Sequence, residues 1–120
     1  MTNYTKKQIA EWKRARKKWV KALRSGKYEQ TQSYLYYDGA FCCLGVLCEV
    51  AGLERDEYDA YAGKRMSAPR EAMRFVGLSH DEGRFGESYL SCENDNGVSF
   101  TRIAEIIEEE PEGLFLESTE

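Results

Sequence analysis

Three cysteines stand in one short apolar run, "AFCCLGVLCEVAG" at residues 40–52. Cys43 is expected to begin a helix, where the helix dipole lowers a thiol pKa and favours the nucleophilic thiolate. The one histidine, His80, follows later in the chain, and Asn94 and Asp95 come after it. Because papain-like enzymes use Cys, His and Asn in that order, one hypothesis is a thiol hydrolase built from these residues.

The stretch "FCCLGVL" is weakly similar to the D-C-S-G-L sequence around the nucleophile of bacterial cell-wall cysteine peptidases. Cys42 replaces the aspartate of that motif, Leu44 replaces its serine, and His80 lies in a glycine-rich segment that would not hold an imidazole rigidly. Free cysteine behaves as a small hydrophobic residue. We therefore favour a structural role for Cys43 and Cys48, as packing residues of the core.

Metal binding is a further possibility, because the chain has four cysteines: Cys42, Cys43, Cys48 and Cys92. Neighbouring residues on a strand point to opposite faces, so Cys42 and Cys43 are poorly placed to share one ion. The C-x-x-C spacing of zinc sites is also missing. We expect no metal and no cofactor.

The N-terminal residues lack the apolar centre of a signal peptide, and no apolar run is long enough for a membrane span. We therefore expect a cytoplasmic protein with reduced thiols and no membrane partner.

Charge is divided unevenly along the chain. Residues 1–27 hold ten Lys and Arg against one acid, Glu11, for a formal charge of +9. The other 93 residues hold seven basic and twenty acidic side chains, for −13. A basic segment can bind nucleic acid. It can also dock on the acidic body of its own chain, which is the interpretation we favour.

The basic residues lie in a predicted helix. Thr5 and Gln8 form a capping box before it, and Ser25-Gly26 ends it, with Gly26 left-handed. The basic residues are expected on the exposed face. The apolar stripe comprises Ile9, Trp12, Ala15, Trp19, Ala22 and Leu23.

A hairpin is predicted next, with Asp38-Gly39 as its turn and strands at about 32–37 and 40–43. Strand alternation would put Tyr34 and Tyr36 on one face, and Leu35 and Tyr37 on the other. Tyr34 and Tyr36 are therefore candidate binding residues, together with the polar turn formed by Asn94, Asp95 and Asn96. The second strand leads into a central helix that carries the cysteines and ends at Gly52.

The second half of the chain predicts two more helices. Residues 53–66 read as a mobile acidic loop with one helical turn, and Pro69 opens a short helix that Gly77 stops. A strand is expected at 88–92 and a tight turn at 94–97. Ser99 caps the last helix, Pro111 limits it, and residues 112–120 form an acidic tail whose Leu114, Phe115 and Leu116 pack back on the body. The whole chain, 1–120, is thus expected to be one small α+β domain.

Two stretches carry a resemblance to a known family: "WVKALRSGKYEQTQSYL…FCCLGVLCEVAGL" and "NDNGVSFTRIAEIIEE". They resemble the paired signatures of small, largely uncharacterised proteins of phage and prophage genomes. The resemblance implies an accessory protein that works in a bacterial cytoplasm. We expect it to act by binding a host protein or a small signalling molecule, for example against host defence, rather than by catalysis. Thiol hydrolysis and nucleic-acid binding through the basic helix are the alternatives.

Overall fold

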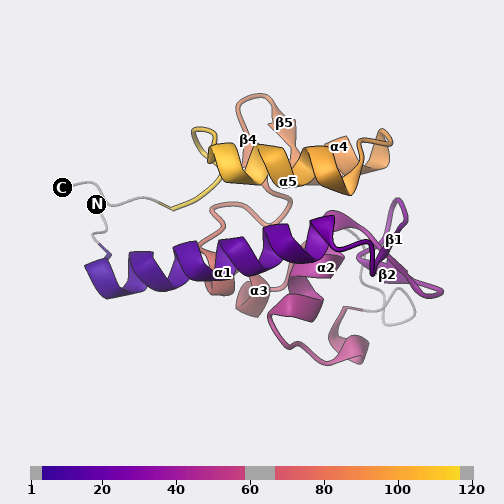
Figure 1. Ribbon diagram of the computed structural model, residues 1–120, viewed down its shortest axis with the longest axis horizontal. Coiled ribbons are helices and arrows are strands. Elements are labelled where there is room, and N and C mark those ends of the chain that lie inside the picture. The colour runs from indigo at the N-terminus through magenta and orange to yellow at the C-terminus, as the bar shows by residue number, and fades with distance from the viewer. Residues whose placement is uncertain (1–3, 59–66, 117–120) are drawn as a thin grey trace.

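The longest element is the helix α1 (Lys6–Arg24), beside which the last helix, α5 (Phe100–Glu109), lies along the long axis of the molecule (Figure 1). The structure is a computed structural model that describes residues 4–58 and 67–116. It confirms the α+β class and both predicted ends of α1. The Thr5 hydroxyl accepts a hydrogen bond from the Gln8 N–H at 3.0 Å, and Gly26 has φ +77° just after the helix.

The predicted apolar stripe of α1 is buried at Trp12, Ala15, Trp19 and Leu23, as expected. One prediction for this helix is wrong. Arg16 was expected on the exposed basic face but is buried. It is four residues from both Trp12 and Val20, and its side chain is covered by Phe115 and by the end of α3 at Val76.

The β-hairpin turns at Asp38-Gly39 as predicted, with φ of 50° and 85°, the positive values of a type I′ turn. The strands β2 (Tyr36–Tyr37) and β3 (Ala40–Phe41) are shorter than expected. Residues 32–35 are not strand, because Ser33 adopts φ 75° and bends the chain. A strand not foreseen, β1 (Glu29–Gln30), pairs parallel with β3 and gives the sheet order β1-β3-β2.

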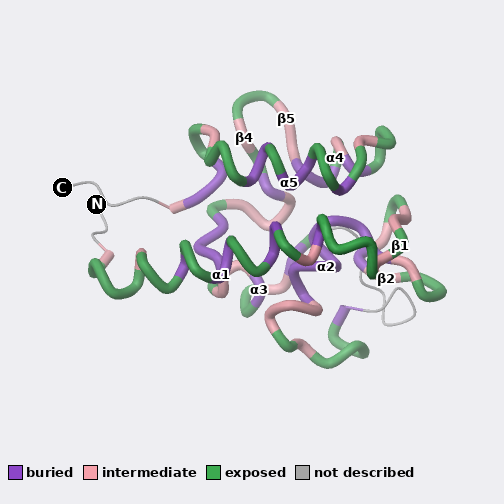
Figure 2. Tube along the Cα trace, in the orientation of Figure 1, coloured by how far each residue is buried: buried purple, intermediate pink, exposed green. Residues whose placement is uncertain are grey.

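The central helix α2 (Cys43–Val50) is the most continuously buried helix in Figure 2. The Cys42 sulfur accepts a hydrogen bond from the Gly45 N–H at 3.4 Å and caps the first turn. Trp19 of α1 donates from its indole Nε1 to the Cys43 carbonyl at 3.0 Å. The cysteine run therefore forms the middle of the core, between α1 and the second half of the chain.

The segment after α2 has the helical turn that was expected, a 3₁₀ turn at Arg55–Glu57. Tyr58 is buried beside it, and residues 59–66 of the predicted mobile loop lie outside the described residues. The short helix α3 (Arg70–Val76) follows Pro69 and ends at Gly77, as predicted.

The predicted strand at 88–92 is wrong beyond its second residue. The strands β4 (Arg84–Phe85) and β5 (Ser88–Tyr89) form a small hairpin, and the helix α4 (Leu90–Asp95) begins immediately afterwards. The predicted turn at 94–97 consequently starts later than expected. Asn94 belongs to the last turn of α4, which Asn96 and Gly97 close.

The C-terminal part of the structure agrees with the predictions made from the sequence. The Ser99 hydroxyl accepts a hydrogen bond from the Arg102 N–H at 3.2 Å and caps α5. Leu114 and Phe115 are buried against the body, and Leu78 and Phe115 form a β-bridge. Residues 117–120 of the predicted tail lie outside the described residues. Within the described ranges, no helix has both the length and the apolar character needed to cross a membrane.

Candidate functional site

The thiol of Cys43 lies inside the core, where it cannot meet a substrate. Cys43 is fully buried, and its Sγ lies 3.6 Å from the Leu90 carbonyl oxygen. Desolvation raises the pKa of the Cys43 thiol well above its ordinary value and that of Cys42 to about 12. The expected lowering by the helix dipole is therefore outweighed by burial, and Cys43 stays protonated at neutral pH.

The proposed catalytic partners of Cys43 have other contacts. His80 accepts a hydrogen bond at Nδ1 from the Glu82 N–H at 3.1 Å, and its ring lies against Tyr89. Asn94 does reach Cys43, but its Oδ1 accepts from the Cys43 main-chain N–H at 3.1 Å. In the described parts of the chain, the hydrogen-bond partner of the Cys43 thiol is a carbonyl, which cannot serve as a base.

We predict from this burial that one thiol reacts in the folded protein. Cys92 is exposed, whereas Cys42, Cys43 and Cys48 are buried. A thiol reagent at pH 8 should label one cysteine quickly in the native protein and all four in denaturant, as counted by mass spectrometry. Rapid native labelling at Cys43 would contradict the structural role and restore the hydrolase hypothesis. Cys92→Ser should abolish the fast phase.

Asn94, a predicted binding residue, is instead a buried junction between three segments. Its Oδ1 accepts from the Cys43 N–H at 3.1 Å and from Gln30 Nε2 at 2.9 Å. Its Nδ2 donates to the Thr31 carbonyl at 2.7 Å. The side chain thus uses its polar atoms within the protein.

The neighbours of Asn94 lie at the surface. Asp95 accepts a hydrogen bond from the Ser33 N–H at 2.8 Å, and Asn96 is exposed at the end of α4.

The two candidate tyrosines do not share a face, so this prediction is wrong. The positive φ of Ser33 breaks strand alternation, and Tyr34 stacks on Tyr37 with ring centroids 5.4 Å apart. Tyr36 is half-buried, and the guanidinium carbon of Arg55 lies 4.2 Å from its ring centroid. Tyr34 is half-buried like Tyr36, and Tyr37 is the exposed one of the three, at 43%.

The largest concentration of charge lies on α1. Of the ten basic residues in 1–27, two pair with acids of α5 and its C-cap. Arg24 holds Glu108 with two hydrogen bonds of 2.8 and 2.6 Å, which lower the pKa of Glu108, and Arg16 lies 3.5 Å from Glu110. Docking on the acidic body, the favoured interpretation, thus accounts for two of the ten charges.

The other eight basic side chains are exposed, and none has an ion pair with any residue in the described ranges. We call these eight the basic face: Lys6, Lys7, Lys13, Arg14, Lys17, Lys18, Lys21 and Lys27. Helical spacing distributes seven of them along the whole length of α1, opposite its tryptophans, and Lys27 follows the helix. Such a row of solvated cations attracts an anionic partner.

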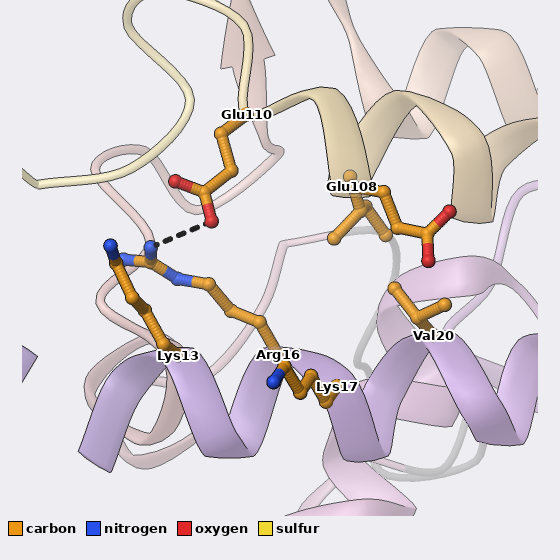
Figure 3. Close-up of a pocket in the computed structure, with 7 residues that line it drawn as sticks. Lys13, Arg16, Lys17, Val20, Glu108 and Glu110 are labelled. Carbon is orange, nitrogen blue, oxygen red and sulfur yellow. Dashed lines mark ion pairs between the residues drawn. The ribbon is translucent and has the colours of Figure 1, made fainter. Parts of the chain in front are cut away.

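A groove runs between α1 and α5, and we call it the α1–α5 groove (Figure 3). Its first hollow has a volume of about 270 Å³ and continues along α1 into a second of about 480 Å³. The first hollow is lined by Lys13, Arg16, Lys17, Val20, Ile107, Glu108 and Glu110.

Arg16 lies at the base of this groove and is the residue that sequence reasoning missed. Its Nε donates to the Val76 carbonyl at 2.7 Å, and its guanidinium carbon lies 3.9 Å from the Phe115 ring centroid. The signal that could have found it is its position between Trp12 and Val20, one turn from each. In the described part of the chain, no group of three His, Cys, Asp or Glu side chains is placed to hold a metal ion.

The fold and this surface together define a small α+β protein with a basic helix along one side. The chain belongs to the family described as Domain of unknown function (DUF8296), which matches over residues 11–111. No curated protein and no solved structure matches the chain.

Proposed function

We propose that the protein is a non-catalytic binding protein whose basic face docks on an acidic surface of another protein. The observation that carries this proposal is the set of eight exposed cations, seven on the long helix α1 and Lys27 just after it, that have no ion pair with the described acids. Exposed cations steer an oppositely charged partner into contact and raise the rate of association. The burial of Cys43 supports binding over thiol chemistry.

The expected partner belongs to a bacterial host, and the protein acts in the cytoplasm as an accessory of a phage or prophage genome. The resemblance to phage proteins supports this setting, and interference with a host defence protein would be one such action. A helix that carries lysines along its whole length suits a broad acidic surface, because lysine is a flexible point charge rather than a planar fork.

Nucleic acid is the second candidate, favoured by the same eight cations. Three observations count against it. Trp12 and Trp19 are buried and offer no stacking platform for single strands. Seven of the eight cations are lysines, which lack the planar fork that suits arginine to nucleic-acid recognition. The −13 charge of the remaining chain also repels phosphate.

The test compares two double variants with the same change of charge. Arg14→Glu with Lys18→Glu alters the basic face, and Arg70→Glu with Arg84→Glu alters exposed arginines elsewhere. Partners captured from a host lysate are identified with the wild type, and binding of the purified partner is then measured for each variant. We expect the α1 pair to weaken binding by about tenfold or more and the control pair to change it by less than about twofold.

A titration with a labelled DNA duplex near physiological salt distinguishes the two candidates. We expect a dissociation constant weaker than about 10 μM, at the weak end of non-specific binding. Sub-micromolar binding with a steep salt dependence, lost in the α1 pair, would make nucleic acid the partner. If both double variants weakened the protein complex equally, the basic face would be ruled out as the docking surface.

A further inference from the structure

We propose that the α1–α5 groove is a separate site for a small phosphorylated compound, whose phosphate is held by Arg16, Lys13 and Lys17. This inference goes beyond the proposed function, since it concerns the groove, to which the basic face contributes Lys13 and Lys17 at its edge. In Figure 3 the three cations come from one side of the hollow, on successive turns of α1, and Glu110 reaches over from the end of α5.

Arg16 is already held in the position that a phosphate would need. The hydrogen bond to the Val76 carbonyl and the stacking on Phe115 fix its guanidinium group, and its side chain is 7% exposed. A fixed arginine loses little conformational freedom when a ligand binds, so its interaction is not offset by an ordering cost. A buried charge also requires an anionic partner beside it.

The anion now beside Arg16 is a replaceable one. Glu110 lies 3.5 Å from Arg16, a longer separation than the roughly 2.7–2.9 Å of a charge-assisted hydrogen bond. Its side chain is 42% exposed, and the residue stands just beyond the last turn of α5. The Glu110 carboxylate can therefore turn into solvent and leave the Arg16 position to a ligand.

The charges around the hollow favour a ligand with more than one negative charge. Two carboxylates line it, and Glu108 is engaged by Arg24 through two hydrogen bonds. Glu110 is left opposite Arg16, Lys13 and Lys17, and these two lysines have no ion pair with described residues. A phosphate monoester carries nearly two charges at neutral pH and presents three oxygens, which matches three cations better than a carboxylate does.

The size and floor of the hollow define the rest of the ligand. A volume of about 270 Å³ is near the lower limit of ligand pockets, which are roughly 300–1,000 Å³, so the organic part must be small. Val20 and Ile107 provide an apolar floor beside the cations. A phosphate joined to a small ring satisfies both features.

Phenyl phosphate is therefore the probe, and isothermal titration calorimetry measures its binding to the wild-type protein. We expect saturable binding that is tighter than that of benzoate, which carries a single charge. Lys13→Gln with Lys17→Gln should weaken the binding about tenfold, and Glu110→Gln should strengthen it about fivefold because the competing carboxylate is removed. Arg16 itself is left intact, since its contacts also hold the fold together.

Two matched controls distinguish binding at a defined site from general attraction by the positive charge of α1. Lys18→Gln and Glu109→Gln each neutralise a residue next to a groove residue but outside its lining, and we expect changes of less than about twofold. The inference would be overturned if phenyl phosphate bound saturably to neither the wild type nor Glu110→Gln. It would also be overturned if Lys18→Gln weakened the binding as much as the Lys13 and Lys17 double variant. Either result would leave the test of the outer face with Arg14 and Lys18 unaffected.

Discussion

Replacing Gly45 by alanine is expected to lower the free energy of unfolding by about 3 kcal/mol or more, although alanine is ordinarily the better helix former. A Cβ at position 45 would overlap the Leu35 carbonyl oxygen and lie 2.7 Å from its carbonyl carbon. That carbonyl cannot retreat easily, because it accepts the Cys42 N–H at 3.1 Å and the Leu35 side chain is fully buried.

Chemical denaturation followed by circular dichroism measures this effect. Gly39→Ala is the matched control, since Gly39 has φ +85° but open space where a Cβ would stand. Its cost should be roughly 1–2 kcal/mol, from the left-handed conformation alone. If Gly45→Ala were no more destabilising than Gly39→Ala, the close crossing of Leu35 over α2 would be disproved.

The second large effect is expected at Asn94. Asn94→Ala should cost about 3–5 kcal/mol, because it leaves the Cys43 N–H and the Thr31 carbonyl without their partner in the core. Gln30 loses one acceptor but keeps its hydrogen bond to the Val98 carbonyl.

Asn96→Ala is the control for Asn94, since Asn96 is two residues away and exposed. It should change stability by less than about 0.5 kcal/mol. Thermal and urea unfolding of both variants provide the measurement. A loss below about 1 kcal/mol for Asn94→Ala would show that the junction is not a main support of the fold.

The features predictable from the sequence were those with local causes. Thr5 and Ser99 cap the helices that follow them, and Asp38-Gly39 fixes its own turn by positive φ. These signals act over a few residues, so a linear reading finds them. The apolar spacing of α1 and α5 is equally local and equally well predicted.

The features that were missed depend on distant residues. The strand β1 exists through pairing with β3, and Arg16 is buried because Phe115 and the Val76 carbonyl cover it. Residues 88–92 were predicted as a strand, but from Leu90 onward the chain forms α4, which packs against α2. The predicted catalytic residues show the same dependence on distant parts of the chain. Cys43 and Asn94 do meet, but across 51 positions and for support of the core rather than for catalysis.

The packing of α1 against α5 also affects how the chain folds during translation. α1 makes its most extensive contacts with α5, which begins at residue 100. At a synthesis rate of about 5–20 residues per second, α1 is made several seconds before α5, one of the helices that cover its apolar residues. During that interval the cations of the basic face flank an exposed apolar stripe, and flanking charges of this kind oppose aggregation. We therefore expect the lysines that we propose as a docking surface to protect the first helix from aggregation while the rest of the chain is translated.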